Sequence, residues 1–177
     1  MTRKVIIDCD PGIDDAVALC MALFDSRINV AAVTAVAGNV PADQASRNVQ
    51  AIIERIDPPR YPRLGAASDP EYSPGSNASS YMHGEDGLGN AGIVVSRLHH
   101  QHPSEKIICD EVRADPNRVR LLCLGPLKNV SRAFHRDPEL PTLIDRIVMM
   151  GGCVYGMGNV TPAAESNMYL DPDSART

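Results

Sequence analysis

The chain has 177 residues, of which 44% are hydrophobic and 22% are charged, and its formal net charge is −5. A chain of this length can bury a sizeable core, so we expect a single domain over residues 1–177. The 17 basic residues are dispersed and outnumbered by 22 acidic ones, which argues against a nucleic-acid-binding protein.

The sequence also argues against export and membrane insertion. Its longest uninterrupted apolar run, Ala16–Phe24, is much shorter than the roughly 20 residues that a membrane span needs. Only Val5–Ile7 separate the basic start of the chain from Asp8, too few for the apolar region of a secretory signal. We therefore expect a cytoplasmic protein with no membrane partner.

The first third of the chain alternates strand and helix patterns. The apolar run Val5–Cys9 ends at acidic residues and Pro11-Gly12, which predicts a buried strand followed by a loop. Asp14 and Asp15 suit the start of a helix, and Ala16–Phe24 continues it with good helix formers. The elements expected next are a strand at Asn29–Ala37, a helix at Pro41–Ile56 and a strand near Tyr61–Gly65.

The rest of the chain continues this alternation after a polar segment. Ser68–Met82 is rich in Ser, Pro, Gly and Asn, which predicts a surface loop. The elements expected after it are helices at Ala91–His100 and Ser104–Ala114, a strand at Val119–Leu124, a helix at Leu127–Arg136, a strand at Arg146–Met150 and a helix opening at Asp171–Ser174.

Strands that alternate with helices predict an α/β fold, with a mostly parallel sheet covered by helices on both faces. Ligands of such Rossmann-like, doubly wound sheets bind beyond the carboxyl ends of the strands. Polar segments follow four of the predicted strands: Asp8–Asp15, Gly38-Asn39, Leu124–Pro126 and Gly151–Asn167. We expect these four segments to converge on one site.

The acidic loop is the first candidate for chemistry. Its four carboxylates, at Asp8, Asp10, Asp14 and Asp15, repel one another unless a cation or hydrogen bonds offset their charge. A hard divalent cation such as calcium, which takes oxygen ligands, is the natural candidate. The alternative is that two of them cap a helix and two line a solvated turn.

Two other acidic-loop motifs can be compared with these residues. An EF-hand beginning at Asp8 needs Gly and Glu where the chain has Ile13 and Leu19, so that motif is excluded. A phosphatase of the haloacid dehalogenase type also has D-x-D after its first strand, with Asp8 as nucleophile and Asp10 as general acid. This alternative leaves the adjacent Asp14-Asp15 pair unexplained and stays open as the second hypothesis.

The motif D-x-D-P-G-x-D-D-A resembles the signature of the inosine-uridine nucleoside hydrolase family. Further segments resemble that family in the same order: Gly38-Asn39, His83–Gly89, Leu124–Asn129, Met149–Gly152, Gly158-Asn159 and Glu165–Asn167. The likeness spans the whole chain. It implies a nucleoside hydrolase-like fold and calcium-dependent hydrolysis of the N-glycosidic bond of ribonucleosides, which gives ribose and a free base.

The resemblance also implies roles for individual residues. Asp10, Asp15 and the backbone carbonyl of Leu124 would bind calcium with support from Asp8, and Asp10 would be the general base for a calcium-bound water. The catalytic residues would be Asp10, Asp14 and Asn39. The substrate-binding residues would be Asp14, Asn39, Asn159, Glu165 and Asn167 around the ribose, with His83 near the base or the entrance. Carboxylates and amide oxygens suit this reaction because positive charge develops on the ribose ring.

Members of this family are longer than this chain, so we expect a product truncated at its carboxyl end. The later part of the family supplies one more Asp ligand and, in several members, a His that protonates the leaving base. Two functional classes therefore stay open: an active hydrolase, and a non-catalytic remnant that binds calcium or ribose. The resemblance further implies a homo-oligomer, a dimer or tetramer, while the base preference cannot be read from the residues.

Overall fold

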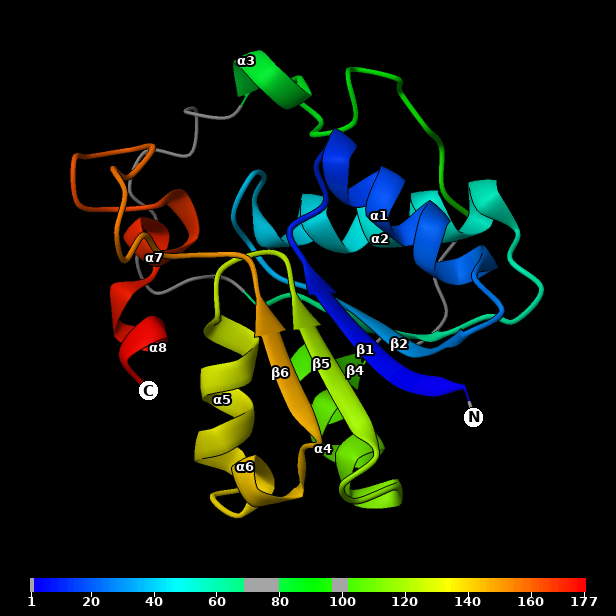
Figure 1. Cartoon of the computed structure of the whole chain (residues 1–177). Helices are drawn as coiled ribbons and strands as arrows, with labels where there is room; N and C mark the ends of the chain where they lie inside the picture. The colour runs from blue at the N-terminus through cyan, green and yellow to red at the C-terminus, as the bar shows by residue number, and fades with distance from the viewer. Residues whose placement is uncertain (1, 69–79, 97–101) are drawn as a thin grey trace.

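The computed structural model describes residues 2–68, 80–96 and 102–177 (Figure 1). Six strands form one sheet in the order β4-β3-β2-β1-β5-β6, and every neighbouring pair is parallel. The strands are β1 (Arg3–Cys9), β2 (Ile28–Ala35), β3 (Arg63–Ala66), β4 (His102–Pro103), β5 (Val119–Cys123) and β6 (Arg146–Met149). The predicted parallel sheet is confirmed.

Helices cover both faces of this sheet, as predicted. They are α1 (Ile13–Phe24), α2 (Ala42–Ile56), α3 (Ser80–His83), α4 (Ser104–Ala114), α5 (Lys128–Arg136), α6 (Leu140–Leu143), α7 (Ser166–Leu170) and α8 (Pro172–Arg176). Helices α1 and α2 lie on one side of the sheet (Figure 1), and their apolar side chains pack with one face of β1 and β2. The apolar side chains of α4, α5 and α6 pack with the other face. In the described part of the chain, no helix is long and apolar enough to cross a membrane.

Strand β1 is the central element because it is buried on both faces. Ile6 packs into the core beneath α4 and α5, whereas Val5 and Ile7 pack into the core beneath α1 and α2. Burial on both faces explains why this strand is a continuous apolar run and does not alternate apolar with polar residues.

The strand order reverses at β1, since β2 lies on one side of it and β5 on the other. The connections that leave β1 and β5 at their carboxyl ends therefore diverge and open a crevice, which is where parallel α/β sheets bind ligands. Figure 1 shows β1, β5 and β6 with their carboxyl ends toward the same side of the molecule. The acidic loop lies at this edge.

One predicted helix is wrong in the part that the structure describes. Residues 91–96 of the predicted helix Ala91–His100 have no regular structure, and residues 97–100 lie outside the described residues. The carboxylate of Asp86 accepts hydrogen bonds from the N–H groups of Leu88, Asn90 and Gly92, and these bonds form a turn where the predicted helix would begin. In the predicted loop Ser68–Met82, residues 69–79 lie outside the described residues, and Ser80 opens the short α3.

Candidate active site

Three of the four carboxylates of the acidic loop are buried. Asp8 is fully buried, Asp10 is 3% exposed and Asp15 is 5% exposed, whereas Asp14 is exposed to solvent. Asp8 belongs to the end of β1, and Asp14 and Asp15 belong to the first turn of α1. The predicted strand, acidic loop and helix therefore place this cluster at the crevice, and the alternative in which Asp8 and Asp10 line a solvated turn is wrong.

Asp8 is bound on one side of its carboxyl group only. Its Oδ1 accepts hydrogen bonds from the Thr34 hydroxyl at 2.5 Å and from Asn129 Nδ2 at 2.8 Å. Its Oδ2 is buried and has no partner in the described part of the chain. Burial raises the pKa of Asp8 to about 7, against the lowering effect of these two hydrogen bonds. A fully buried carboxyl group cannot reach a phosphate ester, so the structure argues against the phosphatase hypothesis.

Asp10 lies between two glycines. Its Oδ2 accepts the backbone N–H of Asn39 at 2.8 Å. A Cβ at Gly38 would overlap with Oδ2 and lie 2.7 Å from Cγ of Asp10, and a Cβ at Gly125 would lie 2.5 Å from its Oδ1. Burial and the charge of Asp15 raise the pKa of Asp10 well above its usual value.

The close approach of Gly38 predicts the effect of a single methyl group. Gly38→Ala is expected to destabilise the fold by about 1–3 kcal/mol, because Asp10 must move and its bond to Asn39 must break. Gly156→Ala is the matched control, since a Cβ at Gly156 meets nothing within 4 Å. Urea denaturation of both variants measures the difference, and equal free energies of unfolding would contradict the predicted clash.

Asp15 and Asp14 have different surroundings although they are adjacent. Oδ2 of Asp15 accepts the backbone N–H of Gly12 at 3.0 Å, and burial raises the pKa of Asp15 to about 6. Oδ1 of Asp14 lies 3.8 Å from Nδ1 of His83, which also accepts the backbone N–H of Ile13 at 3.3 Å. One carboxylate is therefore enclosed by its own loop, and the other faces a histidine from a distant segment.

Side chains from three segments converge on Gly12. A Cβ at this glycine would lie 2.8 Å from Asp14 Oδ1, 3.0 Å from His83 Nδ1 and 3.1 Å from Asn39 Nδ2. Nδ2 of Asn39 also donates to the backbone carbonyl of Asp10 at 3.1 Å. The structure therefore brings together the predicted residues of the acidic loop, the segment after β2 and the segment of His83.

The last predicted segment joins the ends of two strands. Nδ2 of Asn167 donates to the carbonyl of Leu124 at 2.8 Å and to the carbonyl of Met150 at 2.9 Å, so it links the residues that follow β5 and β6. The Leu124 carbonyl, a predicted metal ligand, precedes Gly125, where a Cβ would lie 2.5 Å from Oδ1 of Asp10. Asn167 thus belongs to the same edge of the sheet as the acidic loop.

Glu165 is a helix cap in this structure. Its carboxylate accepts the backbone N–H groups of Asn167 at 2.9 Å, Gly152 at 3.0 Å and Met168 at 3.3 Å. Burial acts to raise the pKa of Glu165, but these hydrogen bonds and the Ser166 hydroxyl outweigh it, and the pKa lies below its usual value. The predicted contact of Glu165 with ribose stays a prediction.

Asn159 is exposed and supports the same turn, because its Oδ1 accepts the backbone N–H of Ser166 at 2.8 Å.

Within the described ranges, no three His, Cys, Asp or Glu side chains are already arranged to hold a metal ion. Asp10 and Asp15 nevertheless offer oxygen atoms alone, the ligand type that calcium and magnesium prefer, and burial first, with neighbouring carboxylates second, raises the pKa of both. The residues present therefore fit a hard cation.

Sequence reasoning missed two buried amides that hold the site together. Asn129 donates to Asp8 and to the carbonyl of Ala35, and Asn48 donates to the carbonyls of Pro11 and Asp86. The available signal was a polar residue on the apolar face of a predicted helix, since a buried amide must find hydrogen-bond partners.

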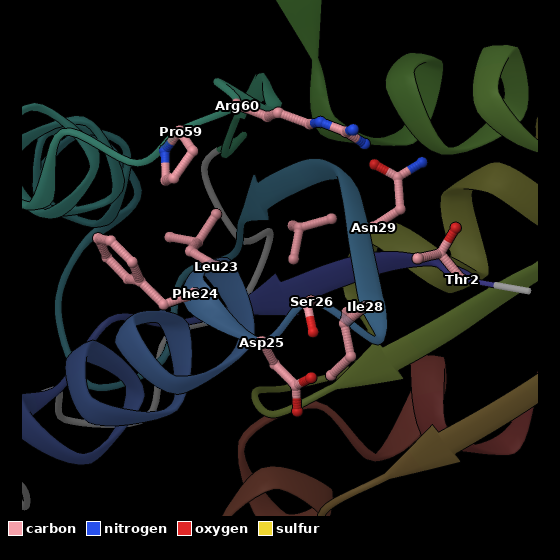
Figure 2. Close-up of a pocket in the computed structure, with 10 residues that line it drawn as sticks. Thr2, Leu23, Phe24, Asp25, Ser26, Ile28, Asn29, Pro59 and Arg60 are labelled. Atoms are coloured by element: carbon pink, nitrogen blue, oxygen red, sulfur yellow. The ribbon is translucent and has the colours of Figure 1, made fainter.

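A separate cavity of about 290 Å³ lies at the opposite, amino-terminal end of the sheet (Figure 2). Phe24 and Pro59 line it on the apolar side, and Asn29 and Arg60 extend into it. Among the described residues that line it, the one acid is Asp25, which pairs with Arg27 at 2.6 Å. The carboxyl groups whose pKa is raised by burial, Asp8, Asp10 and Asp15, lie instead at the carboxyl end of β1, so we place the candidate site there.

Comparison with known proteins identifies one family over almost the whole chain. The family model for inosine-uridine preferring nucleoside hydrolases matches residues 5–177. The chain is 35% identical over 174 residues to uridine nucleosidase 1 of Arabidopsis thaliana, covering 98% of this chain and 52% of that protein. It is 38% identical over 176 residues to the pyrimidine-specific ribonucleoside hydrolase RihA of Salmonella schwarzengrund, covering 99% of this chain and 56% of that protein.

Solved structures agree with these sequence matches. The purine-preferring ribonucleoside hydrolase from Gardnerella vaginalis superposes with a TM-score of 0.90 at 29% identity, over 98% of this chain and 56% of that one. The chain therefore spans about half the length of the relatives that it matches.

Proposed function

The chain belongs to the inosine-uridine preferring nucleoside hydrolase family, and we propose that it carries the ribose- and cation-binding part of an enzyme that hydrolyses the N-glycosidic bond of ribonucleosides. The products are ribose and a free base. The observation that carries this proposal is the convergence of Asp14, Asn39 and His83 on Gly12, directly beside the buried Asp10. Hydroxyl groups of ribose both donate and accept hydrogen bonds, which carboxylate and amide side chains can satisfy.

Asp10 and Asp15 are the residues that would hold a divalent cation, with the carbonyl of Leu124 as a further ligand. Calcium is the ion that we propose, because it accepts carboxylate and carbonyl oxygens in flexible numbers. When bound, the cation supplies positive charge that attracts ribose hydroxyls and makes a water molecule more acidic. The proposal is supported by the raised pKa values of both carboxyl groups, because burial and neighbouring carboxylates disfavour their charged forms and a nearby cation would favour them.

The residues of the chain then have separate tasks. Asp10 accepts the proton of the attacking water, and Asp14 and Asn39 hold the sugar. Positive charge develops on the ribose ring as the C–N bond breaks, so the exposed carboxylate of Asp14 gains attraction in the transition state. Ribose contacts of Asn159, Glu165 and Asn167 and the position of His83 beside the base are part of the same proposal.

Base release by the purified chain tests the proposal directly. We expect release of base from uridine or inosine that stops with a chelator and returns with calcium. Calcium at 100 times its dissociation constant is expected to stabilise the folded chain by about 2.7 kcal/mol, which thermal denaturation detects. Stabilisation without release would indicate a cation-binding unit without catalysis. If calcium does not stabilise the chain and no base is released, the proposal is wrong. The homo-oligomer and the cytoplasmic location stay predictions.

A further inference from the structure

Asn48 is a buried polar residue in the middle of α2. It is 3% exposed and lies on the same buried side of the helix as Ala45, Val49 and Ile52. A side-chain amide in such a position lowers stability unless its hydrogen bonds are satisfied. The hydrogen-bond partners of Asn48 therefore indicate its role.

The amide of Asn48 connects two segments that are far apart in the sequence. Its Nδ2 donates to the carbonyl of Pro11 at 3.2 Å and to the carbonyl of Asp86 at 2.8 Å. Its Oδ1 accepts from Nε2 of Gln44 at 2.8 Å, which orients the amide. Pro11 follows Asp10 in the acidic loop, and Asp86 follows His83 by three residues.

The segment around Asp86, residues 84–92, is tied together internally. We call it the His83 turn, because the backbone N–H of Gly89 also bonds to the carbonyl of His83 at 2.6 Å. Gly87 packs against Asn48 with a φ of +80°, and a Cβ there would lie 2.9 Å from Nδ2 of Asn48 and 3.0 Å from the carbonyl oxygen of Pro11. A turn that is bonded internally moves as a unit, so its position depends on the groups that attach it.

From this geometry we infer that Asn48 is a positioning residue, which fixes the His83 turn against the acidic loop. The inference rests on the proposed function, since it assigns the arrangement to the ribose site. Asn39 holds the carbonyl of Asp10 and Asn48 holds the next carbonyl, that of Pro11. Two side-chain amides thus bind consecutive carbonyls of the acidic loop. Asn48 also binds the carbonyl of Asp86, and so it holds the segment of His83 beside that loop.

Two variants of Asn48 test this role. Asn48→Ala removes the amide, and the isosteric Asn48→Asp replaces the NH₂ group that donates both hydrogen bonds by one oxygen atom, which then faces two carbonyls. Ser46→Ala is the matched control, because Ser46 is buried on the same helix and bonds to Ala42 and Ala67 instead of either loop. If the Asn48 variants do not fold, Gly87→Ala provides a second test, because a Cβ at Gly87 would disturb the same contact from the side of the His83 turn.

Amide hydrogen exchange and the ring ¹⁵N signals of His83 are the measurements. We expect exchange at Ile13, whose N–H donates to Nδ1 of His83 across the two segments, to become about 10-fold or more faster, and the His83 signals to shift, while the amides of β1 and β5 keep their rates. Ser46→Ala should leave the His83 turn unchanged. Wild-type exchange and His83 signals in the Asn48 variants, or equal acceleration throughout the chain, would overturn the inference.

Kinetics separate this inference from the proposed function. If the wild-type chain releases base, Asn48→Ala should lower kcat/KM at least about 10-fold further than Ser46→Ala. Unchanged kcat/KM despite a released turn would also overturn the positioning role. If the wild-type chain releases no base, the catalytic part of the proposed function fails, whereas exchange and His83 signals still decide whether Asn48 attaches the turn.

Discussion

Replacing Asp10 by Asn is expected to lower kcat/KM for base release from uridine or inosine by about 10³-fold or more, since loss of a general base alone costs about 10²–10⁴-fold. The substitution keeps an oxygen that can accept the N–H of Asn39, now at 2.8 Å from Oδ2. It removes the charge that would hold the cation and the group that would accept the proton. Initial rates at saturating calcium measure the effect.

A charge-matched control makes this result specific. Asp145→Asn removes one carboxylate at the opposite end of the sheet, where Asp145 precedes β6 and pairs with Arg120 at 2.6 Å. Its rate should equal that of the wild-type chain. The calcium-dependent thermal shift gives a second measurement, which Asp10→Asn should abolish and Asp145→Asn should keep. Retention of more than a tenth of the wild-type rate by Asp10→Asn would remove Asp10 from the proposed chemistry.

The fold could be predicted where local pattern and burial agree. The helix α4 was expected at Ser104–Ala114 and has those bounds, because apolar residues at helical spacing also face the core. The strands β1, β2, β5 and β6 were apolar runs that ended at Gly, Pro or acidic residues, and each lies within two residues of its expected position. The parallel sheet followed from that alternation.

The parts that could not be predicted depend on contacts between distant residues. Residues 91–96 are coil because the carboxylate of Asp86 binds the backbone N–H of Asn90, just before them, and that of Gly92, within them, which no apolar periodicity reveals. The bond from Asn129 to Asp8 spans 121 positions in the sequence, and the one from Asn48 to Asp86 spans 38. The sequence pattern predicted the carboxylates of the candidate site, whereas the amides that hold its loops could be found only from the fold.

In the presence of a chelator, Asp8→Asn is expected to stabilise the chain at pH 8 and to leave its stability at pH 4 nearly unchanged. The pKa of Asp8 is raised from 3.8 to about 7 by burial, so the folded chain keeps a proton that the unfolded chain has lost. The contribution of protonated Asp8 to the free energy of unfolding is complete below pH 3.8, and it is lost as the pH rises through about 7. The rise in the pKa of Asp8 from 3.8 to about 7 corresponds to a loss of at most about 4 kcal/mol in the free energy of unfolding.

Asn at position 8 should resemble the protonated form of Asp8, because the oxygen that it replaces by NH₂ has no hydrogen-bond partner in the described part of the chain. Asn can keep the oxygen that accepts from Thr34 and Asn129, and its NH₂ group takes the place of Oδ2. The free energy of unfolding, measured by urea denaturation between pH 4 and pH 8, should therefore fall less steeply in the variant. Asp25→Asn is the control: its pKa is lowered to about 2 by hydrogen bonds from Arg27, so this carboxylate is charged in both states above pH 5. Parallel profiles for the wild-type chain and Asp8→Asn would show that Asp8 does not hold a proton in the folded state, and a positive charge near its carboxyl group would then have to be found.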